Sequence, residues 1–479
     1  MLRQLSSTLV LVIAGMLAGC AGMHPWDEAR RTPASPTTPF LARGPAAAVP
    51  SRPVRPSLRD TQGGPLTLAQ CIRIALERNP RTRSSWLSSL SAAATVGEKQ
   101  AAFFPSVDLT SEARRADPAL LDREAQRGPG NAFDAGIGFG YLLFDGGARS
   151  SRVRGAEADL LAANFHHNAT LQDVALSVEE AYYESLADRS SMKVAEEAVK
   201  QAQSHVELAE ARHAAGVVAR SDVLKGETEK AAADLELVRA RSAVQIARGR
   251  LSSAMGLSVS ESFEIADLPK QTNEQNLSDI YGFLNEAARN RPELQSALAQ
   301  VEGKRAEVKA AQARYWPVLT SNASYGWQDR ELEDDREAWA VAVGMSLPIF
   351  SGFERAYQVR RAKYDLDKTI SDHAELLRGV ELEVWTAYSR VVEADQAIDA
   401  AGKLVASAEE SARAAEAEYR TGTGSIIELI DAQTARTAAN TRRVQADLDW
   451  HVARARLRRA IGQMLAGPVN AISKRGGGR

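Results

Sequence analysis

Two kinds of periodicity alternate along the chain. Residues 133–143, 318–328 and 338–347 alternate between two sets of side chains, one mostly larger and apolar, the other mostly small or polar. This is the pattern of β-strands with two different faces. Each segment has roughly ten residues, the length of a tilted strand that crosses a membrane. A soluble hairpin is the alternative, but a face made of Gly, Ala and Ser would be a poor solvent-exposed strand surface.

The stretches around these strands have helical composition. The first helix is expected to begin at Thr67, which forms a capping box with Gln70, and to continue to about Ala102, where Pro105 ends it. Each half of the chain is therefore expected to contain a helix, a pair of strands, a long helix, a turn and a returning helix.

The helices that follow the strand pairs are expected to be very long. Residues 150–215 contain no proline, and 352–421 form a stretch of similar length. At about 1.5 Å per residue each would reach near 100 Å, far more than a globular core needs. Short glycine turns follow, and returning helices then complete two antiparallel hairpins.

Motifs of the first half recur in the second at a nearly constant distance. Asn79-Pro80 corresponds to Arg291-Pro292 at an offset of 212, and Ala254-Met255-Gly256 corresponds to Ala460-Ile461-Gly462 at an offset of 206. Two registers held over many residues predict an internal repeat. The change of six residues places a longer loop in the first half, between Pro105 and Phe144.

The first residues predict an export signal. Arg3 precedes an apolar stretch, and the segment ends in Leu17-Ala18-Gly19 directly before Cys20. This ending resembles a bacterial lipobox, which implies that Cys20 is acylated, for example with palmitate, and becomes the first residue of an outer-membrane lipoprotein. An ordinary signal peptide with a chance cysteine is the alternative. Nine prolines in 25–65 exclude a helix there and predict an extended tether.

These features divide the chain into five parts. They are a signal peptide, a lipid-anchored Pro-rich tether, two structural repeats and a disordered tail, at 1–19, 20–65, 66–270, 271–465 and 466–479.

Composition removes several classes of function. The net charge is −2, so no basic surface indicates nucleic-acid binding. Two cysteines exclude a disulfide scaffold and a cysteine zinc site. The sequence shows no nucleophile elbow, phosphate loop, dinucleotide fingerprint or metal-ligand pattern. We therefore expect no enzyme activity, cofactor or metal.

Four membrane strands cannot close a barrel by themselves. An open sheet edge in lipid would leave backbone groups unpaired, and bacterial barrels begin at about eight strands. The chain must therefore oligomerise; two copies would give eight strands and three would give twelve. Small residues facing the interior would leave a water path: Gly136, Gly138, Gly140, Ala340 and Gly344.

Three motifs together resemble the TolC-type family of outer-membrane efflux and export ducts. They are Phe-Phe-Pro-Ser-Val at 103–107, Leu-Pro-Ile-Phe-Ser-Gly at 347–352 and Tyr-Arg-Thr-Gly-Thr-Gly-Ser at 419–425. The resemblance implies an α+β membrane protein that forms a homotrimer. Its twelve-stranded transmembrane β-barrel lies in the outer membrane and continues into a periplasmic α-helical barrel.

The resemblance also implies the partners. A periplasmic adaptor, or membrane fusion protein, would connect the duct to an inner-membrane RND or ABC transporter, which supplies the energy for passive conduction of small molecules. The outer-membrane component of a type I protein secretion system is the first alternative. A lipid-anchored coiled-coil scaffold without a pore is the second, and it would require continuous heptads.

By the same resemblance the hairpin tips form the periplasmic entrance. Glu428 and Asp431 match an acidic pair that would form rings around the axis of a trimer, where repulsion should raise their pKa values and attract cations. The alternative is that Glu428 only caps a helix with Ser425. Ser221, Asp222 and Tyr419 match residues that hold the entrance shut.

Glycines mark both tips and match positions of adaptor docking: Gly216, Gly422 and Gly424. Any tight helical turn would also favour glycine there. Gly424 stands where the resemblance implies an arginine of the closing network. Either fewer bonds or a neighbouring cation, such as Arg220 or Arg420, would then hold the entrance.

Overall fold

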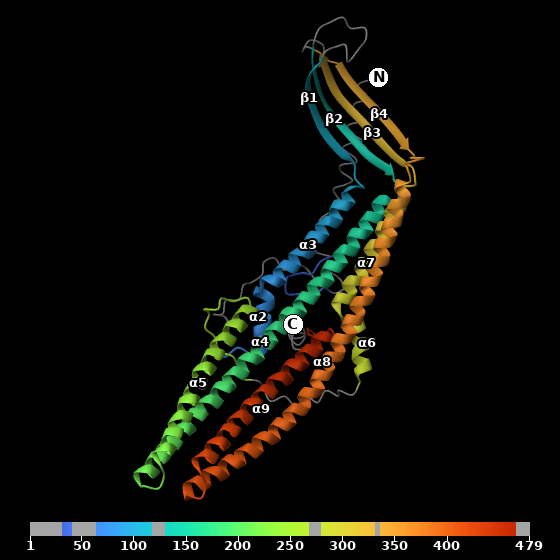
Figure 1. Cartoon of the computed structure of the whole chain (residues 1–479). Coiled ribbons are helices and arrows are strands. Elements are labelled where there is room, and N and C mark those ends of the chain that lie inside the picture. Colours follow the sequence, from blue (N-terminus) through green and yellow to red (C-terminus); the bar gives the residue numbers. More distant parts are fainter. Residues whose placement is uncertain (1–30, 41–63, 117–129, 268–278, 331–335, 466–479) are drawn as a thin grey trace, which may run out of the picture.

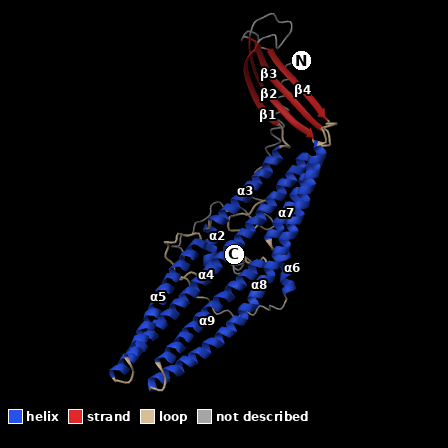
Figure 2. Cartoon of the chain, viewed as in Figure 1, coloured by secondary structure: helices blue, strands red, loops and turns tan. Residues whose placement is uncertain are grey.

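The computed structural model describes residues 31–40, 64–116, 130–267, 279–330 and 336–465. The molecule is elongated, with a four-stranded sheet at one end and helices along the rest of its length (Figure 2). Two pairs of long helices end in turns at the pole opposite the sheet (Figure 1). The elements in chain order are α2 (Leu68–Arg78), α3 (Pro80–Ala101), β1 (Ser106–Ala116), β2 (Gly130–Phe144), α4 (Ala148–Ala214), α5 (Arg220–Ala254), α6 (Ile280–Asn290), α7 (Pro292–Ala313), β3 (Val318–Arg330), β4 (Arg336–Ser346), α8 (Glu354–Thr421) and α9 (Ile426–Ala460).

The sheet has two chemically different faces. Its strands are antiparallel in the order β1-β2-β3-β4. The register places Gly138, Ser324 and Ala340 side by side, in one of several rows of small or polar residues across one face. Larger apolar side chains, all more than half exposed, occupy the other face: Leu109, Ile137, Trp339, Val341 and Met345. This arrangement confirms the alternation predicted for the strands.

The long helices agree closely with the prediction. α4 has 67 residues and α8 has 68, so each is about 100 Å long. α4 pairs with α5 and α8 with α9 as antiparallel hairpins (Figure 1). The predicted capping box at the start of α2 is also present, with Gln70 N donating to Thr67 Oγ1 and Thr67 N to Gln70 Oε1.

The expectation of one helix over 67–102 is wrong. The chain breaks at Asn79, because Pro80 has no N–H to continue α2 and restricts Asn79 to an extended conformation with φ −67° and ψ 126°. The Asn79 side chain then accepts a hydrogen bond from Arg81 N at 2.9 Å and caps α3. Arg291-Pro292 produces the same break between α6 and α7.

The residues at the two breaks make matching contacts. Asn79 Nδ2 donates to the main-chain oxygen of Ala254, the last residue of α5, at 2.9 Å. Arg291 Nη1 donates to that of Ala460, the last residue of α9, at 3.3 Å. Each contact satisfies a carbonyl that a helix end leaves free. Each therefore holds a returning helix against the start of its own half.

Part of the predicted tether is docked on the helices. Asn168 on α4 pairs with the backbone of Phe40, accepting from its N–H at 2.6 Å and donating to its oxygen at 2.8 Å. Asn164 donates to the main-chain oxygen of Arg31 at 2.8 Å. Residues 31–40 therefore lie against α4, where the composition predicted an extended tether.

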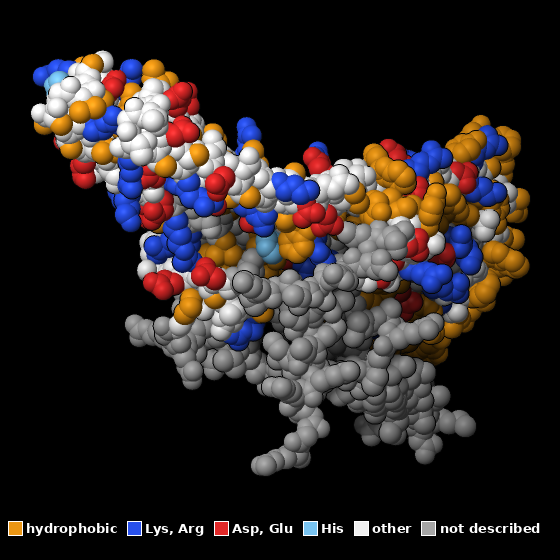
Figure 3. Space-filling view, turned by 90° about the horizontal axis from the view of Figure 1, so that it is seen from below, with side chains coloured by type: hydrophobic (Ala, Val, Ile, Leu, Met, Phe, Trp, Pro, Cys, Tyr) orange, Lys and Arg blue, Asp and Glu red, His pale blue; other side chains and the backbone are white. Residues whose placement is uncertain are grey.

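The predicted signal peptide at 1–19, the acylation site Cys20 and the tail at 466–479 lie outside the described residues. Among the helices that are described, none combines the length and apolar character needed to cross a membrane. Hydrophobic side chains gather at the end of the molecule that carries the sheet, whereas Lys, Arg, Asp and Glu are mixed over the helical part (Figure 3).

Candidate functional site

The glycines of the hairpin tips are required by the turns. Gly422 has φ +86° and Gly216 has φ +75°, conformations that side chains with a Cβ rarely adopt. The N–H groups of Gly422, Thr423 and Gly424 all donate to the oxygen of Glu418. A Cβ on Gly424 would lie 3.0 Å from Glu418 Cβ. Turn geometry explains all three glycines, and their role in adaptor docking stays a prediction.

The acidic pair lies at the start of α9. Ser425 Oγ accepts from Glu428 N at 3.3 Å, and Glu428 Oε2 accepts from Ser425 N at 2.8 Å, which is a complete capping box. Hydrogen bonds from the backbone N–H and then the hydroxyl of Ser425 lower the pKa of Glu428. Asp431 is exposed one turn further on. Within one chain Glu428 is a helix cap, and its ring around an axis stays a prediction.

The other tip places its predicted residues beside a groove. Ser221 lines a groove of about 590 Å³ between α5 and α9, together with the apolar side chains of Leu224, Ile427 and Ile430. Asp222 lies in the first turn of α5, with Oδ1 3.8 Å from Lys225 Nζ. The fold therefore brings the first tip against the start of α9, the helix that carries the acidic pair.

Tyr419 occupies the contact between the two tips. It is 1% exposed and packs with Ile426, Leu429 and Leu208, the last of which belongs to α4. Among the described residues its hydroxyl has no hydrogen-bond partner. Burial raises the pKa of Tyr419; the charge of Arg212 opposes this rise and that of Asp222 adds to it.

Arg212 is a tip residue that the sequence analysis missed. Its Nη1 donates to the main-chain oxygen of Tyr419, and its guanidinium carbon lies 4.6 Å from the centre of the Tyr419 ring. Arg420, which the sequence suggested as a closing cation, pairs instead with Glu416 on its own helix at 2.7 Å. The only sequence signal for Arg212 was a basic residue in the last turn of α4, which is common at helix C-termini.

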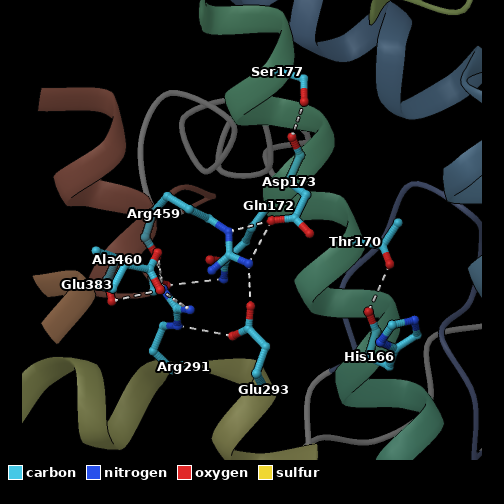
Figure 4. A network of polar contacts seen from close by, with 11 residues as sticks. His166, Thr170, Gln172, Asp173, Ser177, Arg291, Glu293, Glu383, Arg459 and Ala460 are labelled. Atoms are coloured by element: carbon cyan, nitrogen blue, oxygen red, sulfur yellow. Dashed lines mark hydrogen bonds and ion pairs between the residues drawn. The ribbon is translucent and has the colours of Figure 1, made fainter. Parts of the chain in front are cut away.

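A second polar cluster joins the helices near the middle of the molecule (Figure 4). Arg459 on α9 donates to Asp173 on α4 at 2.8 Å and also bonds Glu293 on α7. Arg291 pairs with Glu383 on α8 at 2.8 Å and lies 3.1 Å from Glu293. We name these five residues the charged junction.

The charged junction sets two buried arginines against three carboxylates that are partly exposed. Arg459 is 7% exposed and Arg291 is 5% exposed. Burial would raise the pKa of Glu293, but Arg459 and Arg291 outweigh it, so that the pKa is lowered. The carboxylate therefore stays ionised and holds both cations between the helices.

Comparison with known proteins identifies a matching family model and several relatives of the chain. A family model described as "Outer membrane efflux protein" matches residues 71–257 and 283–463. Protein CyaE of Bordetella pertussis is 26% identical over 415 residues, covering 85% of this chain and 86% of that protein. The probable efflux pump outer membrane protein TtgC of Pseudomonas putida is 23% identical over 440 residues, covering 88% of each. Outer membrane protein TolC of Vibrio cholerae is 22% identical over 409 residues, covering 83% of this chain and 91% of its own.

Solved structures show the same fold. The outer-membrane channel OprN aligns with a TM-score of 0.75 at 20% identity, covering 83% of this chain and 90% of its own. The MtrE outer membrane channel of Neisseria gonorrhoeae aligns with a TM-score of 0.71 at 22% identity, covering 83% of this chain and 89% of its own. The resemblance to TolC-type ducts is confirmed.

Proposed function

Since the chain belongs to the outer membrane efflux protein family, we propose that it works as the exit duct of a tripartite efflux pump. Three copies would form a twelve-stranded barrel in the outer membrane and a periplasmic tunnel of long helices. Each chain contributes two structural repeats, 66–270 and 271–465. The duct is passive, and an inner-membrane RND or ABC transporter supplies the energy through a periplasmic adaptor.

The open sheet supports assembly. Among the described strands β1 and β4 each pair with one neighbour, so both edges of the sheet remain available. In lipid such edges must pair with strands of other copies. The apolar face is exposed, with Leu109 82% and Val341 61% accessible, and it matches the lipid-facing surface of a barrel.

Exposed apolar side chains on the long helices support the same assembly. Leu382 and Trp385 on α8 are 66% and 52% exposed, and Val238 and Ile246 on α5 are 62% and 55% exposed. Neighbouring copies would cover these side chains in a closed tunnel. The length of α4 and α8, about 100 Å each, suits a tunnel that reaches from the outer membrane towards an inner-membrane pump.

The hairpin tips would form the entrance of the tunnel. Glu428 and Asp431 are exposed on α9, and three copies would place six carboxylates around the axis. Ser221, Asp222 and Tyr419 lie at the same pole and would take part in closing it. Acylation at Cys20 would anchor the chain in the outer membrane.

Substitutions on the two opposite faces of β4 test the proposed barrel. Val341→Arg puts a charge on the proposed lipid face, which costs about 2–4 kcal/mol near the middle of a bilayer, whereas Ala340→Arg puts the same charge on the face proposed to line the lumen. The purified wild type is expected to insert into planar bilayers as a trimer and to conduct ions.

Val341→Arg is expected to lose insertion, while Ala340→Arg keeps insertion and changes only the conductance. A protein that stays monomeric and never inserts would refute the barrel and favour a scaffold. Equal loss of insertion in both variants would refute the assignment of the two faces.

A further inference from the structure

Arg212 connects the tips of the two helical hairpins. It lies in the last turn of α4, and its Nη1 donates a hydrogen bond to the main-chain oxygen of Tyr419 in the last turn of α8. Its guanidinium also covers the Tyr419 ring, 4.6 Å from the ring centre. One side chain of the first hairpin therefore holds both the backbone and the ring of a buried residue in the second.

Both contacts are suited to a cation. Carbonyl groups in the last turn of a helix have no partner within the helix and lie at the negative end of its dipole. The Tyr419 oxygen also accepts from Gly422 N at 3.2 Å, so Arg212 adds a second, charged donor to an acceptor in a favourable field, and the aromatic face attracts the same charge. The fit is close, because a Cβ on Gly422 would lie 3.3 Å from Arg212 Nη2.

The hairpins are joined at a second place, far from the tips. Ion pairs connect α9 to α4 near the middle of the molecule: Arg456 with Glu180, Arg458 with Glu179 and Arg459 with Asp173. From Glu179 to Arg212, α4 runs for 33 residues, about 50 Å at 1.5 Å per residue. Because the hairpins are joined far from their tips, the tips can move apart more than any other part. A bond at Arg212 therefore opposes their separation at the place where the displacement is largest.

We propose that Arg212 is the latch that holds the α8–α9 tip against the α4–α5 tip in the closed entrance. Its charge takes the place of the arginine that Gly424 lacks. Arg212 is a positioning residue: by fixing Tyr419 it fixes the start of α9, which carries Glu428 and Asp431. The inference rests on the entrance proposed above and names the contact that keeps it closed.

The contact predicts which atoms of Tyr419 are needed to keep the tips together. Arg212 binds the main-chain oxygen and the ring, whereas the Tyr419 hydroxyl has no hydrogen-bond partner in the described structure. Tyr419→Phe therefore retains the latch. A closing bond made by the hydroxyl to Asp222 would instead be lost in this variant.

Two measurements on the full-length protein test the latch. Spin labels on Val217→Cys and Ile427→Cys, exposed positions on the two tips (63% and 52%), report the distance between the tips whether or not the protein conducts. Conductance in planar bilayers reports whether the entrance is open or closed. The variants are Arg212→Ala, Arg212→Lys and Tyr419→Phe, with Arg239→Ala as control, since Arg239 is an exposed α5 arginine paired with Glu236 on its own helix.

Arg212→Ala is expected to widen the distribution of tip distances and to raise the open fraction on the order of tenfold, the scale of one charged hydrogen bond. Arg212→Lys gives a smaller increase, because an ammonium group keeps the charge but not the planar stacking. Tyr419→Phe and Arg239→Ala behave as wild type.

Tip distances that do not change in Arg212→Ala would overturn the latch and leave the duct standing. Opening caused by Tyr419→Phe would also overturn it, since the hydroxyl would then hold the tips. A wider tip distance without conductance in any variant would support the latch and refute the duct.

Discussion

At the scale of single residues, a buried histidine makes a polar contact between two helices. His167 is 0% exposed on α4, where its Nδ1 lies 2.8 Å from Ser85 Oγ on α3. The backbone of Thr38 in the docked segment 31–40 faces it, and the neighbouring His166 is exposed. Burial lowers the pKa of His167 to about 4, helped by the charge of His166 and opposed by Thr38.

This lowered pKa predicts a loss of stability in acid. Unfolded histidine has a pKa of about 6.5, so between about pH 6.5 and pH 4 the unfolded chain binds the proton more strongly than the folded one. The contribution of neutral His167 is present above pH 6.5 and declines as the pH falls to 4, by up to about 3 kcal/mol.

Thermal unfolding followed by circular dichroism at pH 7.5 and pH 4.5 measures this effect. His167→Gln cannot be protonated, so its melting temperature is expected to fall less between the two pH values than that of the wild type. Carboxylates titrate in both proteins and cancel in the comparison. Equal falls would show that His167 does not contribute.

At the scale of elements, the charged junction determines how the two hairpins meet. Arg459 joins α9 to α4 and α7, while Arg291 joins the start of α7 to α8 and to the end of α9. Removing one partner of a fully buried ion pair costs about 3–5 kcal/mol, whereas exposed pairs contribute about 0–1 kcal/mol. The junction lies between these limits, because Arg459 is buried while Asp173 is partly exposed and Glu293 also lies beside Arg291.

Arg459→Met is therefore expected to destabilise the protein by about 1–3 kcal/mol, because Asp173 loses its cation and Glu293 keeps only Arg291. Arg390→Met provides the matched control, since Arg390 and Glu393 are both more than 60% exposed. Melting temperatures of the two variants test the difference. If both variants had the same melting temperature as the wild type, the junction would have no role in stability.

At the scale of the whole molecule, the function of Glu428 depends on assembly. Glu428→Gln removes the charge and keeps a side chain that can complete the capping box with Ser425, whereas Ser425→Ala removes the cap and keeps the charge. In a trimer the first change is expected to reduce the cation selectivity of the pore, since three carboxylates leave the entrance, and the second is expected to preserve it.

Reversal potentials across a KCl gradient measure this selectivity. Unchanged selectivity in Glu428→Gln would show that the residue serves only as a helix cap. Helicity measured in parallel reports whether either change shortens α9.

Much of the fold could be predicted because its signals are local. Strand alternation, the Thr67 capping box and proline-free stretches each lie within one element, and backbone geometry converts each of them directly into a strand or helix. The single helix expected over 67–102 failed for a local reason as well, since Pro80 had to end it. The tip glycines were found because φ angles near +80° at Gly216 and Gly422 require them.

By itself the sequence determined most of the elements, their order and the family. Only the tertiary structure decided which distant side chains meet: Arg212 binds a residue 207 positions away, and Arg459 one 286 positions away. A charged side chain on a long helix has the same local pattern whether it points to solvent or to another helix. Its partner depends on how whole hairpins pack, which no single stretch of sequence specifies.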